Sequence, residues 1–308
     1  MTLPNIGTNK LSTIPNIKML LLKAGIKKSS YDPRKLSDVS LPNNQLFFDA
    51  FEFNKSSCRL YHQVVDWELG SDIIHPCYLH SIAFPLHIML LLLPDFPFPL
   101  LGLIHIDNQI TQLRPIKVGE RLSVSSCFGK LKLHPKGWLF SIKVEFHSKS
   151  ELVWQSKSTN LFRTNHGYDV APSNLHLIGD ITNPTIINRK LSTNLGRRYA
   201  KVSGDFNPIH LSRWSAKLFG FKQHIIHGMW TKSYCISVMQ KVSPSTFMQA
   251  FEINTTFKQP LYLPNQINIA VPSTASDSDP DKSHFKVVGT EIYNEQQPLH
   301  LIGNIRSI

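Results

Sequence analysis

The chain has 308 residues, which is enough for one large domain or for two domains of about 150 residues. Apolar residues make up 42% of the sequence and charged residues 18%, and this balance excludes an intrinsically disordered chain. The four cysteines are widely spaced and include no C-x-x-C pair. Cysteine usage therefore argues against a disulfide framework or a cysteine zinc site and predicts a cytoplasmic protein.

No segment of the sequence predicts insertion into a membrane. The longest apolar stretch, residues 88–104, is interrupted by Asp95 and by prolines, so it is too broken to span a bilayer. The apolar run MLLL that follows Lys10 and Lys18 is too short for the core of a signal peptide. We expect a soluble protein.

The formal net charge of +12 is unusual, and the charges are unevenly distributed. Residues 181–250 contain ten Lys or Arg residues and a single acidic residue, Asp205. Nearby cations lower the pKa of a carboxyl group, so we expect Asp205 to be ionised. The same surface would attract an anionic partner, whether a nucleic acid, the phosphates of coenzyme A or an acidic carrier protein.

The first part of the chain predicts a helix followed by several strands. Residues 1–45 contain a short amphipathic helix and otherwise resemble loop, and we expect them to form an extension docked on the following residues. An apolar helix is predicted at residues 78–93. Alternating apolar and polar residues then predict antiparallel strands within 106–124, 138–146 and 152–162.

The second part of the chain repeats this order. Pro, Asn, Asp and Gly crowd residues 165–184 and predict a loop that divides the chain nearly in half. A second apolar helix is predicted at residues 228–242. It precedes alternating strands within 251–269, 284–293 and 299–306.

The two series also align in sequence. Residues 106–124 match residues 251–269 at an offset of 145, so that Pro115 falls on Pro260. A long helix followed by antiparallel strands, occurring twice, predicts an α+β protein in which a sheet wraps around each helix. Two unrelated α+β domains remain the alternative at this level of argument.

One polar turn carries the residue types of an acid–base site. Residues 199–212 read YAKVSGDFNPIHLS, with Asp205 and His210 on either side of Asn207-Pro208. The residue before a proline avoids the helical region, so this turn can present Asp205 and His210 towards one point. A carboxylate and an imidazole that converge on one water can activate it. The alternative is an Asx turn that caps the next helix.

The sequence downstream of this turn favours the catalytic interpretation. His227-Gly228 opens the second apolar helix, so the Gly228 amide lies among the unpaired N–H groups of a helix N-terminus. Glycine permits a ligand oxygen to approach closely, and the helix dipole favours negative charge there. An enolate oxygen formed from a thioester needs such a donor. The alternative is that Gly228 only caps the helix and His227 is a core or turn histidine.

These residues resemble the hydratase-2 motif of the MaoC-like dehydratases. The motif positions are all present, and they are Tyr199, Ser203, Gly204, Asp205, Asn207, Pro208, His210, Ala216, Gly220, Phe221, His227, Gly228 and Met229. Segments elsewhere are similar to a bacterial branch of acyl dehydratases that contains two hot-dog folds, in which one half has lost the motif. The first half of this chain has no G-D-x-N-P-x-H, which agrees.

The resemblance implies a double hot-dog fold, an α+β architecture. Two long central helices would each be wrapped by an antiparallel sheet, with the two sheets joined edge to edge. The expected division is an N-terminal extension at 1–45, a non-catalytic half at 46–165, a linker at 166–190 and a catalytic half at 191–308. Residues 78–93 of the non-catalytic half are expected to shape the acyl tunnel.

The resemblance also implies an activity, which is the reversible hydration of trans-2-enoyl thioesters to (R)-3-hydroxyacyl thioesters. The thioester would be carried by coenzyme A or by an acyl carrier protein. Asp205 and His210 would hold and activate the water, the Gly228 amide would receive the thioester oxygen, and Asn207 and Ser203 would orient the pair. No cofactor and no metal ion is implied, and a homodimer of double hot dogs is compatible with the family.

The residues alone offer several other candidates. Arg197 and Arg198 would suit the phosphates of an acyl carrier, although two solvated charges explain them equally well. The pairs His224/His227 and His75/His80 each lack a third ligand for a metal ion. His80 and His87 flank the first apolar helix and are more typical of packed or capping histidines.

Two other classes of function remain open from the sequence. A non-catalytic hot-dog protein that binds acyl thioesters would keep the same residues for binding or assembly. A basic protein that binds RNA or DNA would explain the net charge. Trp138, Trp154 and Trp230 are not interleaved with basic residues, which argues against a stacking surface for nucleic acid.

Overall fold

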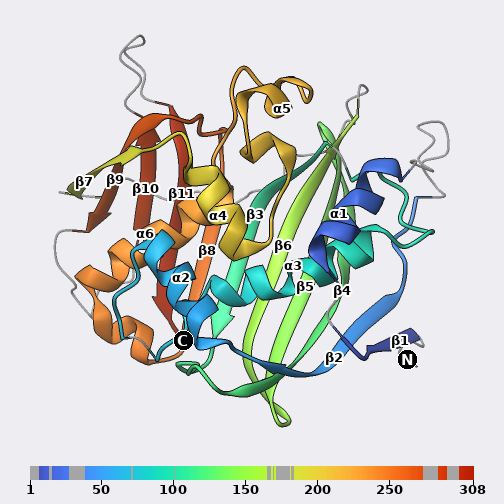
Figure 1. Cartoon of the computed structure of the whole chain (residues 1–308), viewed down its shortest axis with the longest axis horizontal. Helices are drawn as coiled ribbons and strands as arrows, with labels where there is room; N and C mark the ends of the chain where they lie inside the picture. Colours follow the sequence, from blue (N-terminus) through green and yellow to red (C-terminus); the bar gives the residue numbers. More distant parts are fainter. Residues whose placement is uncertain are drawn as a thin grey trace.

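The computed structural model describes residues 7–13, 16–27, 39–70, 72–100, 102–164, 168, 170, 181, 184–272, 284–289 and 298–308. Their strands form one eleven-stranded sheet in the order β1-β2-β4-β5-β6-β3-β8-β11-β10-β9-β7. The long helices lie against one face of this curved sheet (Figure 1). The predicted α+β class with a wrapped sheet is confirmed.

The first half supplies five consecutive neighbours in the sheet, in the order β2-β4-β5-β6-β3. The buried apolar side chains of these strands, among them Val124, Phe140 and Val144, belong to the hydrophobic core. The strands are β2 (Asn44–Glu52), β3 (Leu103–Gln112), β4 (Arg121–His134), β5 (Gly137–Ser148) and β6 (Glu151–Arg163).

The second half repeats that arrangement in the order β7-β9-β10-β11-β8. When the strands of each half are taken in chain order, these two spatial orders are the same, so the halves share one topology. The strands are β7 (Pro184–Leu191), β8 (Phe251–Phe257), β9 (Asn265–Pro272), β10 (His284–Gly289) and β11 (Leu299–Ser307). Unrelated domains, the alternative left open by the sequence, are therefore excluded.

The two half-sheets join edge to edge through β3 and β8, which pair antiparallel. Asp107 lies opposite Thr256, and Thr111 lies opposite Glu252. The first pair becomes the second when each residue is replaced by its counterpart at an offset of 145 residues. The register of the junction thus follows the internal repeat seen in the sequence, and the pairing covers the edge that each half would otherwise expose.

Each half-sheet wraps one long, buried helix. In the first half this helix is α3 (Tyr78–Leu91), and in the second it is α6 (Gly228–Val242). Every residue of α6 from Met229 to Gln240 is buried, as expected for a helix enclosed on all sides rather than lying on a surface. The sequence prediction placed both helices correctly.

Two further helices pack against each other between the halves, α2 (Lys55–Val65) and α4 (Leu195–Ser203). Both end in a residue with left-handed backbone geometry, Asp66 at φ 57° and Gly204 at φ 78°. Tyr61 and Tyr199 each lie five residues before that position, and their hydroxyls are 3.4 Å apart. The helix pair is therefore a second element of the pseudo-twofold arrangement.

Helices and strands also occur in the predicted N-terminal extension and in the predicted linker. β1 (Gly7–Leu11) pairs in parallel with β2, and α1 (Ile17–Ile26) packs near α3, so the N-terminal extension docks on the first half. β7 pairs with β9 although most of it falls within the segment 166–190 expected to be a linker. Residues 184–190 of that segment therefore form part of an edge strand, although most of their side chains are exposed. The proposed domain boundaries stay predictions.

In the part of the chain that the structure describes, no helix combines the length and apolar character needed to cross a bilayer.

Candidate active site

The polar turn begins where α4 ends. Gly204 adopts φ 78°, a geometry that favours glycine, and its amide donates a hydrogen bond to the carbonyl oxygen of Ala200 at 2.9 Å. Ser203 is buried, and its Oγ accepts a hydrogen bond from the Asp205 amide at 3.3 Å. The chain thereby reverses direction and directs Asp205 away from the helix.

Two side chains stabilise the turn by local hydrogen bonds. Oδ1 of Asp205 accepts from the Asn207 amide at 3.1 Å, and Oδ1 of Asn207 accepts from the Ile209 amide at 3.3 Å. Asn207 caps the short 3₁₀ helix η2 (Pro208–His210). The Asx turn considered as an alternative is therefore present, but it uses only one carboxylate oxygen of Asp205.

His210 is fixed in one tautomer by the carbonyl oxygen of Ile225. Nδ1 of His210 lies 2.8 Å from this oxygen, and because a carbonyl only accepts, Nδ1 must donate. The neutral ring therefore has an unprotonated Nε2 that can accept a proton. The side chain is buried, at 8% exposure.

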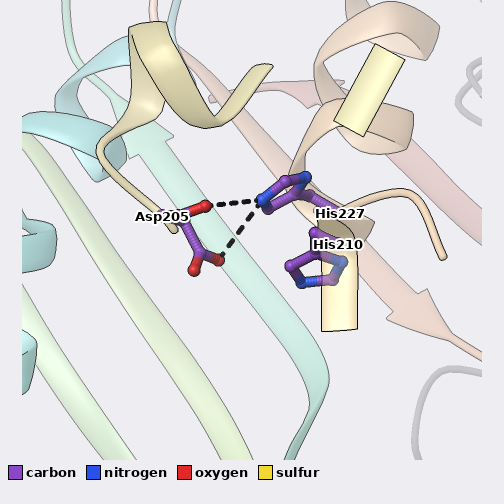
Figure 2. Close-up of side chains that lie close together, drawn as sticks. All are labelled: Asp205, His210 and His227. Atoms are coloured by element: carbon purple, nitrogen blue, oxygen red, sulfur yellow. Dashed lines mark hydrogen bonds and ion pairs between the residues drawn. The ribbon is translucent and has the colours of Figure 1, made fainter. Parts of the chain in front are cut away.

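His227, at the N-cap of α6, completes the cluster. Its Nε2 donates to the main-chain oxygen of Asp205 at 2.8 Å and lies 3.9 Å from Oδ2 of the same residue. Its ring stacks on that of His210 with centroids 3.7 Å apart. Figure 2 shows both histidines on one side of Asp205 with the carboxylate directed towards them.

The three side chains are close enough to hold one small polar molecule. One ligand atom from each of Asp205, His210 and His227 lies within 4.8 Å of the others. A water that bonds two groups at about 2.8 Å each separates them by about 4.5 Å, which matches this spacing. The spacing of Asp205 and His210 would therefore permit acid–base chemistry through one shared water.

The same cluster also has the composition of a metal site. The sequence pattern pairs His227 only with His224, whereas the fold brings His227 together with Asp205 and His210. Nε2 of His227 already donates to a carbonyl oxygen, so a metal ion would have to displace that hydrogen bond. In this arrangement the three side chains are therefore better suited to bind a water than a metal ion.

Gly228 is the first residue of α6 and is exposed, whereas His227 before it and Met229 after it are buried. Within the part of the chain that the structure describes, its amide donates to no acceptor. A Cβ atom built on Gly228 would lie 2.9 Å from the ring of Phe257, so a larger side chain would require movement. Glycine thus keeps the helix N-terminus open beside the cluster.

Burial controls the protonation of the cluster. It raises the pKa of Asp205, an effect that His210 and the Asn207 amide oppose. The expectation that cations lower this pKa gave the wrong direction, because no Lys or Arg is among the groups that shift it. Burial lowers the pKa of His210 against the influence of the Asp205 carboxylate, and it holds the pKa of His227 well below its usual range.

Arg197 and Arg198 lie on the solvent-exposed face of α4 rather than in the cluster. Arg197 donates through Nη1 to the carbonyl oxygen of Leu211 at 2.8 Å, which ties α4 to the residue after His210. The structure places neither guanidinium against Asp205. Their role as phosphate contacts stays a prediction.

The first half has no comparable cluster because different residues occupy the corresponding positions. Trp67 follows the left-handed residue Asp66, where Asp205 follows Gly204. The N-cap of α3 is Cys77 rather than a histidine, and its first residue is Tyr78 rather than a glycine. Trp67 packs edge-on against the ring of His75 at 4.6 Å. Among the described residues, the cluster of Asp205, His210 and His227 therefore has no counterpart in the first half.

The other histidine and tryptophan candidates have structural roles. His224 hydrogen-bonds through Nε2 to the carbonyl oxygen of Thr193 at 2.8 Å, and His75 does so to that of Ser233 at 3.1 Å. Neither predicted histidine pair gains a third ligand within the described residues. Trp138, Trp154 and Trp230 are buried, which removes them as a stacking surface.

Comparisons with known proteins agree with this geometry. Residues 183–295 match the model of the MaoC like domain, and this segment contains the whole cluster. The chain therefore contains a segment that is similar to the MaoC like domain. It is 28% identical over 224 residues to 3-hydroxyacyl-thioester dehydratase X of Mycobacterium tuberculosis, covering 73% of this chain and 78% of that protein.

Solved structures confirm the double hot-dog fold of this chain. The crystal structure of HtdX from M. tuberculosis superposes with a TM-score of 0.69 at 24% identity, covering 86% of this chain and all of that one. A second M. tuberculosis protein, described as having a double hot-dog fold, superposes with a TM-score of 0.55 at 10% identity, covering 88% of this chain and 97% of that one.

Proposed function

We propose that this protein catalyses the reversible hydration of trans-2-enoyl thioesters to (R)-3-hydroxyacyl thioesters. The observation that carries the proposal is the convergence of Asp205, His210 and His227, whose ligand atoms lie within 4.8 Å of one another, together with the exposed Gly228 at the start of α6. The MaoC like domain match and the 3-hydroxyacyl-thioester dehydratase among its relatives support the same activity.

In the hydration direction, the Asp205 carboxylate and Nε2 of His210 hold the water. The tautomer set by Ile225 leaves Nε2 free to accept a proton as the water oxygen attacks C3 of the enoyl group. The electron pair of the double bond moves to C2, which takes up a proton from the same pair of residues. No proton is gained or lost overall, and dehydration follows the reverse path.

The thioester oxygen becomes negative as C3 is attacked, and Gly228 offers its amide at the positive end of α6. Asn207 and Ser203 orient the turn through the bonds described above. His227 acts as a positioning residue, because it holds the main chain of Asp205 and supports the ring of His210. We assign these roles on geometry.

The acyl chain is expected to extend towards α3 in the first half, which lacks the catalytic residue types. A rate series over trans-2-enoyl-CoA chain lengths tests this expectation. Truncation of a large buried side chain of α3, such as Leu86→Ala, should change the preferred chain length. Equal and very low rates at every length would count against coenzyme A thioesters as substrates.

The decisive experiment follows crotonyl-CoA and longer enoyl-CoAs by the loss of their conjugated absorbance. Asp205→Asn and His210→Ala should each lower kcat by at least about a hundredfold, the scale usual for positioned acid–base groups. The asparagine side chain in Asp205→Asn keeps the shape of the turn, so folding is retained. Turnover within about threefold of wild type in both variants would refute the assignment. Thioester binding without turnover in the wild type would instead indicate a binding protein.

A further inference from the structure

An exposed basic surface borders the candidate active site. It comprises the outward residues of α4, of the short helix α5 (Arg213–Lys217) and of the loop that follows, and we call it the α4–α5 surface. Its six exposed cations form no ion pair within the described part of the chain. They are Arg197, Arg198, Lys201, Arg213, Lys217 and Lys222.

Two large apolar side chains stand out among these cations. Trp214 is 80% exposed and Leu218 is 85% exposed, the highest values among the exposed large hydrophobic residues that the structure describes. Lys217 lies 5.7 Å from the ring of Trp214. Isolated exposed apolar residues are common, but a Trp and a Leu four positions apart on one face, within a basic patch, are typical of the centre of a protein interface.

The α4–α5 surface is attached directly to the catalytic turn. Oγ of Ser215 in α5 donates to the carbonyl oxygen of Pro208 at 2.7 Å, and Arg197 of α4 donates to the carbonyl oxygen of Leu211. His210 lies between these two acceptors in the sequence. In Figure 1, α5 projects beyond the helices that cover the sheet. A partner docked here would therefore sit beside the site.

We propose that the α4–α5 surface docks an acidic carrier protein that presents its thioester to the cluster. This inference rests on the proposed function and names the partner that supplies the substrate. Six cations without acidic neighbours provide charge complementarity to an acidic helix, and Trp214 and Leu218 provide apolar anchors. The phosphates of coenzyme A would need fewer cations and no aliphatic anchor. A five-residue helix offers too little apolar area to hold a membrane.

The test uses a purified bacterial acyl carrier protein bearing phosphopantetheine, with and without a crotonyl group. Binding of the form without the crotonyl group is measured by calorimetry, which does not require turnover. Wild-type protein should bind it, with affinity falling as salt rises. Arg213→Glu combined with Lys217→Glu should weaken binding at least about tenfold, and Trp214→Ser combined with Leu218→Ser should do the same through loss of the anchors.

The matched control is Lys130→Glu combined with Lys132→Glu, two exposed cations of β4 in the other half. It makes the same change in net charge and should leave carrier binding as in wild type. For kinetics, the ratio of kcat/KM for crotonyl-carrier to that for crotonyl-CoA should fall at least about tenfold only in the α4–α5 variants.

Each alternative result has a clear meaning. Equal loss with carrier and CoA substrates would identify the surface as a nucleotide site and overturn the proposal. Binding to anionic lipid vesicles but not to carrier protein would also overturn it. If the carrier binds as expected but no enoyl thioester is hydrated, the docking surface stands and the proposed reaction fails.

Discussion

The imidazole rings of His210 and His227 stack with their centroids 3.7 Å apart and an interplanar angle of 29°. Two imidazolium ions at this distance would repel strongly in a buried site, so the pair carries at most one positive charge. His227 is the ring that stays neutral, because burial and the neighbouring His210 both lower its pKa. If either ring of the stack binds a proton, we therefore expect it to be His210.

The first prediction concerns His227 as a positioning residue. His227→Phe keeps a ring against His210 but removes the donor to the Asp205 main chain, and we expect kcat to fall at least about tenfold with little change in KM. His227→Gln should recover part of the loss, since its amide can reach the same oxygen. A purely structural role would lower stability equally in both variants and would show no recovery.

The second prediction concerns the pH dependence of hydration. Because burial lowers the pKa of His210 from 6.5, Nε2 should remain an acceptor below the pH at which an exposed histidine titrates. The acid limb of kcat/KM should therefore lie below pH 6.5. Because burial also raises the pKa of Asp205, protonation of this carboxyl group should add to the loss of activity at acid pH. A pH–rate profile with its inflection above pH 6.5 would contradict this assignment.

Much of the fold was predictable because local patterns and a repeat agreed. Alternation identified most strands, and the offset of 145 residues predicted two similar halves. The register of β3 against β8 is consistent with this offset. The strand β7 was missed because it has mostly exposed side chains at the edge of the sheet, and its apolar alternation is weak. Strands at the edge of a sheet show a weaker alternation of apolar and polar residues than central strands do.

The candidate site was predicted less completely. The spacing of Asp205 and His210 identified the turn, but His227 lies seventeen residues beyond His210, and only tertiary packing places it over the turn. The direction of the Asp205 pKa shift also depended on packing, because burial outweighs the charge of the surrounding sequence. The charge pattern also does not predict the burial of Lys232. This residue is fully buried on α6, and its Nζ donates a hydrogen bond to Asn108.

The third prediction concerns the close approach at the start of α6. In Gly228→Ala the new methyl group would meet the Phe257 ring at 2.9 Å, so either the ring or the helix N-terminus must move. We expect kcat/KM to fall at least about tenfold, since displacement of an oxyanion donor is costly. Adding Phe257→Leu should restore part of the rate. Wild-type rates in Gly228→Ala alone would remove Gly228 as the donor.

The last prediction concerns acid stability and uses His87 on α3. Burial lowers the pKa of His87 from 6.5 to about 4, and its Nε2 has no hydrogen-bond partner within the described residues. Below pH 6.5 the unfolded chain binds a proton that the folded chain does not, so stability is complete above that pH and falls towards pH 4. At pH 5 this one residue should cost about 2 kcal/mol.

His87→Phe removes that proton equilibrium while keeping an aromatic ring in the core next to His80. Urea unfolding at pH 7.5 and pH 5 should show that the variant loses about 2 kcal/mol less than wild type over this interval, whatever its stability at pH 7.5. His147→Gln, at a partly exposed histidine of β5, serves as the matched control. The comparison depends on the difference between the two pH values, so a general packing defect in His87→Phe cancels. Equal losses of unfolding free energy in wild type and His87→Phe would show that His87 is protonated in the folded protein at pH 5. That result would contradict the lowered pKa of this buried histidine.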